Sequence, residues 1–177
     1  MAKLIYALNQ SLDGYIDHDA FAPPGIELFR HFIEHTRNSA AAIYGRVMYE
    51  TMRYWDAEDP NWDADRRAYA QAWRVMPKWV VSRTLKAAGP NATLISDNVE
   101  AAIREVKKKL SGDIEIAGPA LAHSLRDANL IDEYQIYLRP FVVGKGKTYF
   151  PGPRPKLRYV TSERIGEDAL RLTYAPE

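Results

Sequence analysis

Residues 40–55 read Ala-Ala-Ala-Ile-Tyr-Gly-Arg-Val-Met-Tyr-Glu-Thr-Met-Arg-Tyr-Trp and carry the clearest signal of fold class. Ala40 to Tyr44 is a short apolar run that ends at Gly45, which is typical of a buried strand followed by a tight turn. After the glycine, apolar side chains recur at helical spacing, so the pattern predicts a helix from Arg46 to Trp55. Since a strand buried on both faces needs helices on both sides of its sheet, the stretch indicates an α/β protein.

The same alternation of strand and helix extends in both directions from this stretch. Short apolar runs predict further strands at Leu4–Leu8, Lys78–Val81 and Ile114–Ala117. Helices are predicted over Ile26–Thr36 and Asp63–Trp73. A further helix begins at the pair Asp97 and Glu100 and ends at Gly112, and another begins at Pro119. Beyond Leu130 only strands are predicted, namely a half-exposed one that runs to Pro140, then Leu157–Ile165 and Ala169–Ala175, joined near Gly166.

This order of elements predicts an α/β fold with three layers, α/β/α. Its central sheet is expected to be mixed and mostly parallel, with a C-terminal antiparallel hairpin. The chain shows no repeat and no linker, so we expect a single domain over residues 1–177. Three local features are also predicted: a capping box formed by Asp97 and Glu100, a solvated helix end at Lys107–Lys109, and a core position for Trp79.

Composition narrows the possible partners and compartment. Of 177 residues, 46% are hydrophobic, which is enough to fill one core. Since 24 Lys and Arg face 23 Asp and Glu, there is no large basic field, and we expect neither a nucleic acid nor a membrane partner. The chain has no cysteine, which excludes disulfides and thiolate chemistry. The first apolar run reaches Asn9 too early for a signal peptide, so the expected location is cytoplasmic.

Residues suited to an anionic ligand follow three of the predicted strands. Gly45 lets the backbone approach an anion, and Arg46 adds a charge at a helix start. Ser82-Arg83-Thr84 offers two hydroxyls and a guanidinium, which suit a phosphate monoester such as the 2′-phosphate of NADPH. Gly118-Pro119 opens a helix whose N-terminus suits a pyrophosphate. Since parallel strands end at one edge of a sheet, the three places together predict a site for an anionic dinucleotide.

The order of segments resembles the dihydrofolate reductase-like superfamily. It is most similar to the reductase domain of riboflavin biosynthesis, the C-terminal domain of a bifunctional deaminase-reductase, and to its free-standing relatives. The segments that carry the resemblance are Ser11–Ile16, Gly45–Glu50, Lys78–Thr84, Ile116–Leu121, Leu130–Tyr134 and Pro140–Gly146. They cover nearly the whole chain in the same order, and no single one of them is decisive.

The resemblance implies a reductase that uses NADPH and forms a homodimer. It implies that Gly45, Arg46 and Val47 meet the cofactor phosphates and that Ser82 and Arg83, with Thr84 beside them, meet the 2′-phosphate. The residues implied to line the pyrophosphate and the nicotinamide are Gly118, Pro119, Ala120 and Leu121. Asp13 and Gly14 would lie at the mouth of the substrate cleft.

Two departures from the family pattern concern the cofactor side of the site. Met48 stands where relatives usually have Thr, which removes a hydrogen bond near the nicotinamide. Ala117-Gly118 stands where relatives usually have Gly-Gly, a pair joined by a cis peptide in dihydrofolate reductases. A cis bond without proline costs about 3 to 4 kcal/mol, so the geometry of this bond is open.

Hydride transfer to a heterocycle also needs a proton, and a carboxylic acid is the expected donor. Asp13 is the first candidate, because the turn after the first strand holds it at the cleft; Glu50 and Glu27 are the others. No arginine stands near Met76 and Pro77, where dihydrofolate reductases clamp the folate glutamate. The expected substrate is therefore a smaller pyrimidine or pteridine, as in 5-amino-6-(5-phosphoribosylamino)uracil reductase or dihydrofolate reductase.

Two other functions remain open from the sequence. Because Met48 and Ala117 replace residues that the chemistry uses, the chain could be a non-catalytic, nucleotide-binding relative. The third reading is a zinc peptidase, since His31, Glu34 and His35 match the H-x-x-E-H pattern on a predicted helix. Phe32 and Ile33 within that pattern belong to the apolar stripe of the helix, which argues against it.

Overall fold

A computed structural model describes residues 1–152 and 155–177. The strands are β1 (Lys3–Ser11), β2 (Ala41–Gly45), β3 (Lys78–Val81), β4 (Ala92–Ile95), β5 (Asp113–Ala117), β6 (Glu133–Arg139), β7 (Leu157–Ile165) and β8 (Ala169–Pro176). The α-helices are α1 (Ile26–Asn38), α2 (Arg46–Met52), α3 (Ala64–Val75), α4 (Val99–Lys109) and α5 (Pro119–Asp127), and two 3₁₀ turns cover His18–Ala20 and Arg53–Asp56.

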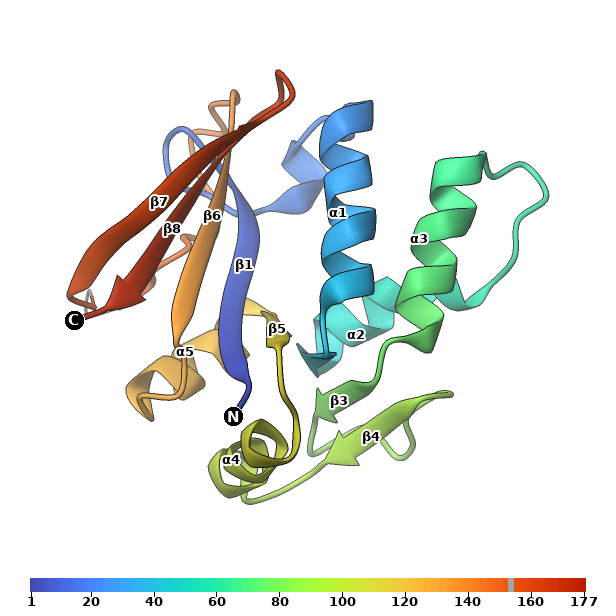
Figure 1. Cartoon of the computed structure of the whole chain (residues 1–177), viewed down its shortest axis with the longest axis vertical. Helices are drawn as coiled ribbons and strands as arrows, with labels where there is room; N and C mark the ends of the chain where they lie inside the picture. Colours follow the sequence, from blue (N-terminus) through green and yellow to red (C-terminus); the bar gives the residue numbers. More distant parts are fainter. Residues whose placement is uncertain (153–154) are drawn as a thin grey trace.

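The strands form one sheet in the order β4-β3-β2-β5-β1-β6-β8-β7. All pairs from β4 to β6 are parallel, whereas β8 is antiparallel to β6 and to β7. The fold is thus the predicted mixed, mostly parallel sheet with a C-terminal antiparallel hairpin. Helices α1 and α3 lie side by side on one face, and α4 and α5 lie on the other, which completes the three layers (Figure 1).

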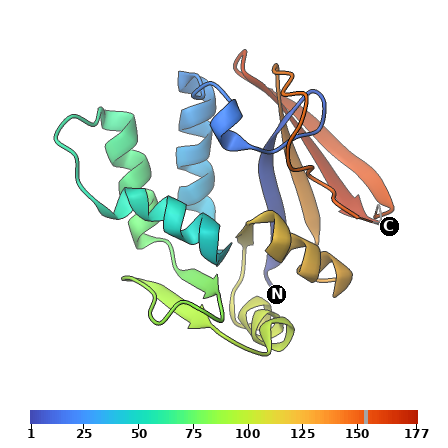
Figure 2. The ribbon, with the colours of Figure 1, turned by 180° about the vertical axis from the view of Figure 1, so that it is seen from behind.

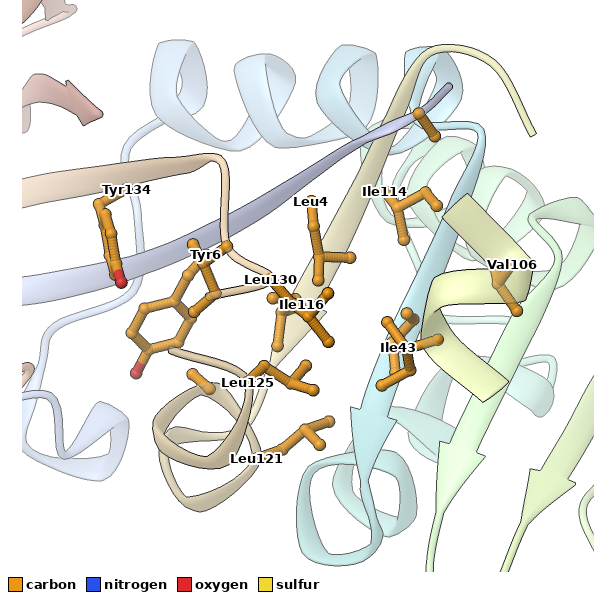
Figure 3. Packing of buried hydrophobic residues seen from close by; sticks show 14 of the residues in the cluster. Leu4, Tyr6, Ile43, Val106, Ile114, Ile116, Leu121, Leu125, Leu130 and Tyr134 are labelled. Carbon is orange, nitrogen blue, oxygen red and sulfur yellow. The ribbon is translucent and has the colours of Figure 1, made fainter. Parts of the chain in front are cut away.

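Alternating side chains of the parallel strands explain why both faces are covered. The larger core packs Leu4, Ile43, Ile114 and Ile116 of the strands against residues of α4 and α5 (Figure 3). On the opposite face, Leu28 of α1 and Trp73 of α3 cover two smaller apolar clusters. Since the central strands β1, β2 and β5 bury side chains on both faces, their sequences read as continuous apolar runs rather than as clean alternation.

Four element predictions were wrong or incomplete. Strand β4 was missed, because an edge strand of four residues with partly exposed side chains leaves almost no periodic signal. The helix predicted over Arg46–Trp55 ends at Met52 and continues as a 3₁₀ turn. The capping box does not form, since Asn98, in the left-handed region, is the N-cap of α4 and makes no side-chain cap bond. Strand β6 is not half-exposed but is buried along most of its length, because α1 and the β7–β8 hairpin cover its polar face.

The predictions for Lys107 and Trp79 were also wrong in part. Lys107 was expected in solvent, yet it is 6% exposed and its Nζ donates to the Leu130 carbonyl (2.9 Å) and to Asp132 (2.5 Å). On β3, Lys78 is buried, whereas its neighbour Trp79 is only partly buried. Lys78 reaches the Met76 carbonyl (2.7 Å) and lies over the Trp73 ring, which satisfies its ammonium group at the end of α3.

Candidate functional site

The loops after β3, β2 and β5 lie next to one another at one edge of the sheet, which we call the carboxyl edge. Strand β2 pairs in parallel with β3 on one side and with β5 on the other, so that Gly45 aligns with Val81 and Tyr44 with Ala117. The three segments that the sequence analysis singled out, at Gly45, Ser82 and Gly118, are therefore neighbours. Ligands of open α/β sheets bind at this kind of edge.

Two helices begin at the carboxyl edge almost in contact. Helices α2 and α5 begin next to each other (Figure 2), their N-caps are Gly45 and Gly118, and neither N-cap makes a side-chain cap hydrogen bond. Gly118 has φ +122°, and a Cβ added to it would lie 3.5 Å from the Gly45 nitrogen. The Ala117–Gly118 bond, left open by the sequence, is trans. The uncapped starts of both helices, with the positive ends of their dipoles, thus meet at these two glycines, an arrangement that favours an anion.

Side chains of both helices surround this pair of glycines. A Cβ on Gly45 would lie 3.8 Å from Leu121, which is buried in the larger core. A Cβ added to Gly118 would lie 4.0 Å from the Met48 Cβ. Met48 packs on the apolar cluster that contains Trp73 of α3. Val47 is 67% exposed, and Ala120 is exposed at the start of α5 beside the half-buried Pro119. The residues predicted to line the cofactor thus gather at one place, with apolar contacts where the family pattern has a hydroxyl.

In the loop after β3, Ser82 has a structural role and its neighbour Arg83 is exposed. Ser82 is buried, and its Oγ accepts hydrogen bonds from the backbone N–H groups of Thr84 (3.2 Å) and Leu85 (3.0 Å). Its hydroxyl therefore holds the turn. Arg83 and Thr84 are exposed, and in the described part of the chain the Arg83 guanidinium has no hydrogen-bond or ion-pair partner. Arg83 is thus a cation that remains available to an anion.

Arg46, in contrast, already has a partner. Its Nη1 lies 3.0 and 3.2 Å from the two carboxylate oxygens of Glu50, one helical turn later, and both side chains are about half exposed. An exposed pair of this spacing contributes well under 1 kcal/mol, so an incoming phosphate can compete for Arg46. Glu50 therefore serves here as a counter-ion, which disfavours the predicted role of proton donor.

Asp13 ties two loops together at the end of β1. Its carboxylate accepts hydrogen bonds from Ser11 Oγ (2.6 Å) and from the backbone N–H groups of Val143 (3.1 Å) and Gly144 (2.7 Å). These hydrogen bonds, that of Ser11 above all, lower the pKa of Asp13 to about 2. A carboxylate that stays ionised at neutral pH is a poor proton donor, so the environment disfavours the predicted role and indicates a structural one.

Glu27 lies in the first turn of α1 and is exposed. It faces the turn between β7 and β8, because a Cβ on Gly166 would lie 2.9 Å from the Glu27 Cβ. The backbone at Gly166 has φ +55°, so glycine suits this close approach. The three predicted acids thus lie in different elements: Asp13 and Glu50 have hydrogen-bond partners, and Glu27 lies against the turn at Gly166.

The side chains of the zinc-peptidase pattern do not converge. The Nε2 atom of His31 hydrogen-bonds to Tyr137 Oη (2.9 Å), and the Nε2 atom of His35 lies 3.7 Å from Glu115. Glu34 is exposed and pairs with Arg37 (2.5 Å). Within residues 1–152 and 155–177, no group of three His, Asp or Glu side chains is placed to hold a metal ion. The zinc-peptidase reading is therefore wrong.

Glu115 is an acidic side chain that the sequence analysis missed. It lies in the middle of β5 on the face beneath α1, next to His35. Burial raises the pKa of Glu115, and the nearby His35 opposes this shift. A lone carboxylate inside a run predicted to be a buried strand was the available signal. Burial of a carboxylate whose neighbouring cation is a histidine 3.7 Å away costs stability.

Replacing Glu115 with glutamine is expected to stabilise the fold at neutral pH. Because the folded pKa lies above the unfolded one, the native state binds more protons between these two values. The free energy of unfolding therefore falls as pH rises through this window, and the full penalty is present above it. Glutamine keeps the shape without the charge, so we expect a gain of about 1 kcal/mol at neutral pH that vanishes near pH 4.

Urea unfolding at both pH values measures this difference, and Glu167→Gln is the matched control, because Glu167 is exposed in the β7–β8 turn. An equal gain at both pH values would instead attribute the effect to packing.

The fold is an α/β domain in which the loops at Gly45, Ser82 and Gly118 lie together at the carboxyl edge of one sheet. The sequence model of the RibD C-terminal domain matches residues 2–171, so the chain belongs to the RibD C-terminal domain family. It is 24% identical over 138 residues to the uncharacterized protein YyaP of Bacillus subtilis (strain 168), a match that covers 75% of this chain and 71% of YyaP.

Solved structures share the fold. A putative riboflavin biosynthesis protein from Shewanella sp. PV-4 superposes with a TM-score of 0.72 at 20% identity, over 100% of this chain and 99% of that one. RibD of Acinetobacter baumannii gives 0.68 at 16% identity over 100% of this chain and 58% of RibD. Dihydrofolate reductase of Enterococcus faecalis, complexed with NADP(H) and RAB-propyl, gives 0.64 at 17% identity over 99% and 96%. The chain therefore has the dihydrofolate reductase-like, reductase-type fold.

In the described part of the chain, no helix is long and apolar enough to cross a membrane.

Proposed function

We propose that this protein is an NADPH-dependent reductase that transfers a hydride to a pyrimidine or pteridine compound. The observation that carries the proposal is the contact between the two uncapped helix starts at Gly45 and Gly118, with the unpartnered Arg83 on the neighbouring loop. The family and the NADP(H) complex of a reductase with the same fold support it. The homodimer and the cytoplasmic location expected from the sequence stay predictions.

The residues at the carboxyl edge fit NADPH. Because Gly118 has no side chain, no Cβ crowds the Gly45 nitrogen, and a pyrophosphate would bind at the two helix starts. Arg83 would bind the 2′-phosphate, and Ser82 would position Arg83 by holding the turn. Bound NADPH supplies the hydride from its nicotinamide. Pro119, Ala120, Leu121 and Met48 would shield the nicotinamide side from water.

For the proton, we assign solvent water rather than an acid of the chain. Asp13 is held ionised by three hydrogen bonds, Glu50 is paired with Arg46, and Glu27 lies at the C-terminal hairpin. The same observation favours the second candidate function, a nucleotide-binding relative that does not catalyse reduction. Tight NADPH binding without oxidation of NADPH by any pyrimidine or pteridine would favour that alternative.

Replacing Arg83 with alanine is expected to weaken NADPH binding by about tenfold to a hundredfold, because a charge-assisted bond to phosphate contributes about 1.5–3 kcal/mol. NADH lacks the 2′-phosphate, so its affinity should hardly change. Nicotinamide fluorescence during titration measures both dissociation constants. The matched control is Arg158→Ala, which removes an exposed arginine from β7 at the opposite edge of the sheet.

Three outcomes would count against the proposal. If wild type binds neither cofactor, the reductase function fails although the fold stands. If Arg83→Ala weakens binding of NADPH and NADH equally, Arg83 does not contact the 2′-phosphate. If Arg158→Ala has the same effect as Arg83→Ala, the loss reflects net charge alone.

A further inference from the structure

A concave surface lies between α1 and α3, near the C-terminal end of α2 and away from Gly45. It is a hollow of about 340 Å³. Helices α1 and α3 run side by side (Figure 1), and residues at the starts of both line the hollow together with Trp55, which follows α2. The apolar lining consists of Pro23, Pro24, Ile26, Phe29 and Trp55, and the charged lining of Asp63, Asp65 and Arg66. We call this surface the aromatic hollow.

The aromatic walls of the hollow are held in place by other rings. The Phe29 ring stacks on Tyr69 with centroids 5.7 Å apart, and Trp55 packs on Tyr69 at 4.7 Å and on Trp62 at 5.3 Å. The Nε1 of Trp62 donates to Tyr54 Oη (3.0 Å), which fixes this ring in turn. Because the rings are already immobilised, a ligand that contacts them loses little affinity to the ordering of side chains.

The charges at the rim cancel one another. Arg66 pairs with Asp63 (3.0 Å), which also caps α3, and Arg30 of α1 pairs with Asp65 (3.0 Å). Both carboxylates and both guanidinium groups thus have partners, and the four side chains carry no net charge. A phosphorylated or otherwise anionic ligand would find no excess positive charge here, and a cation would find no excess negative charge.

The remaining feature is an apolar surface that folding leaves uncovered. Ile26, the first residue of α1, is 53% exposed at the hollow, and Phe29 and Trp55 are only partly buried. A hollow of about 340 Å³ is at the small end of ligand pockets, which suits one ring system. We propose that the aromatic hollow is a binding site for the uncharged, planar aromatic group of a small molecule, held between Ile26, Phe29 and Trp55.

Two compounds that share a uracil ring test this proposal. In 1-benzyluracil the ring carries an uncharged aromatic group, and in uridine 5′-monophosphate it carries a phosphorylated sugar. Isothermal titration calorimetry of the full chain, without NADPH, is expected to detect binding of 1-benzyluracil. Uridine 5′-monophosphate is expected to bind at least about fivefold more weakly. The variant Ile26→Lys places a charge at the apolar rim and should weaken binding of 1-benzyluracil at least about fivefold.

The matched control is Val75→Lys. Val75 is 69% exposed at the last residue of α3, at the opposite end of that helix from the hollow, so this variant should bind 1-benzyluracil as wild type does. No binding of 1-benzyluracil, or equal weakening by both lysine variants, would overturn the proposal. Tighter binding of uridine 5′-monophosphate that Arg66→Ala abolishes would overturn it as well. Since NADPH is left out, failure of the reductase function would leave these results unchanged.

Discussion

Replacing Gly118 with alanine is expected to weaken NADPH binding by at least about thirtyfold and to lower the free energy of unfolding by about 1–3 kcal/mol. The backbone at Gly118 has φ +122°, which residues with a side chain rarely adopt. The added Cβ would lie 3.5 Å from the Gly45 nitrogen and 3.7 Å from the Gly45 Cα. It would thus occupy the space through which an anion reaches the start of α2. Titration with NADPH and urea unfolding measure the two effects.

Gly112→Ala separates loss of the binding site from backbone strain. Gly112 precedes β5 as Gly118 follows it, it has φ +93°, and a Cβ there would lie 3.6 Å from Ala40. Both variants therefore carry a similar strain, but only Gly118→Ala obstructs the carboxyl edge. If the two variants lose stability alike and both keep full NADPH affinity, the cofactor does not bind at the contact between the two helix starts.

The layers of the fold could be predicted from sequence because each buried strand is a short apolar run followed by a turn. Residues 40–55 illustrate this, since the change from an apolar run to helical spacing falls at Gly45 in both sequence and structure. Prediction failed where tertiary contacts decide. Strand β4 is short and lies at the edge of the sheet, and the polar face of β6 is buried because α1 and the β7–β8 hairpin cover it.

The candidate site could be predicted as a location but not in its chemistry. Topology alone brings Gly45, Ser82 and Gly118 together, because parallel strands end at one edge. The roles of single side chains depend on their neighbours. Asp13 is a turn residue that three hydrogen bonds keep ionised, and the residues of the aromatic hollow come from segments far apart in the sequence. The spacing of residues along the chain does not predict such contacts.

Replacing Lys107 with methionine is expected to lower the free energy of unfolding by about 2–3 kcal/mol, a large share for a chain of this size. The Lys107 ammonium group is the buried donor for the Leu130 carbonyl, and it pairs with Asp132. Methionine fills the same space without a donor, so the carbonyl loses its partner in a dry environment. Asp132 also accepts a hydrogen bond from the Leu4 N–H (2.7 Å), and the Lys107 carbonyl accepts one from Ala2.

This environment makes Lys107 a link between α4, the start of β1 and the segment before β6. Lys109→Met is the matched control, because Lys109 lies in the same turn but is exposed, and it should change stability by less than about 0.5 kcal/mol. Equal effects of the two variants would mean that the ammonium group of Lys107 contributes no more than a solvated one. A larger effect of Lys107→Met would show that this buried lysine, unlike its solvated neighbour, stabilises the junction of α4, β1 and the segment before β6.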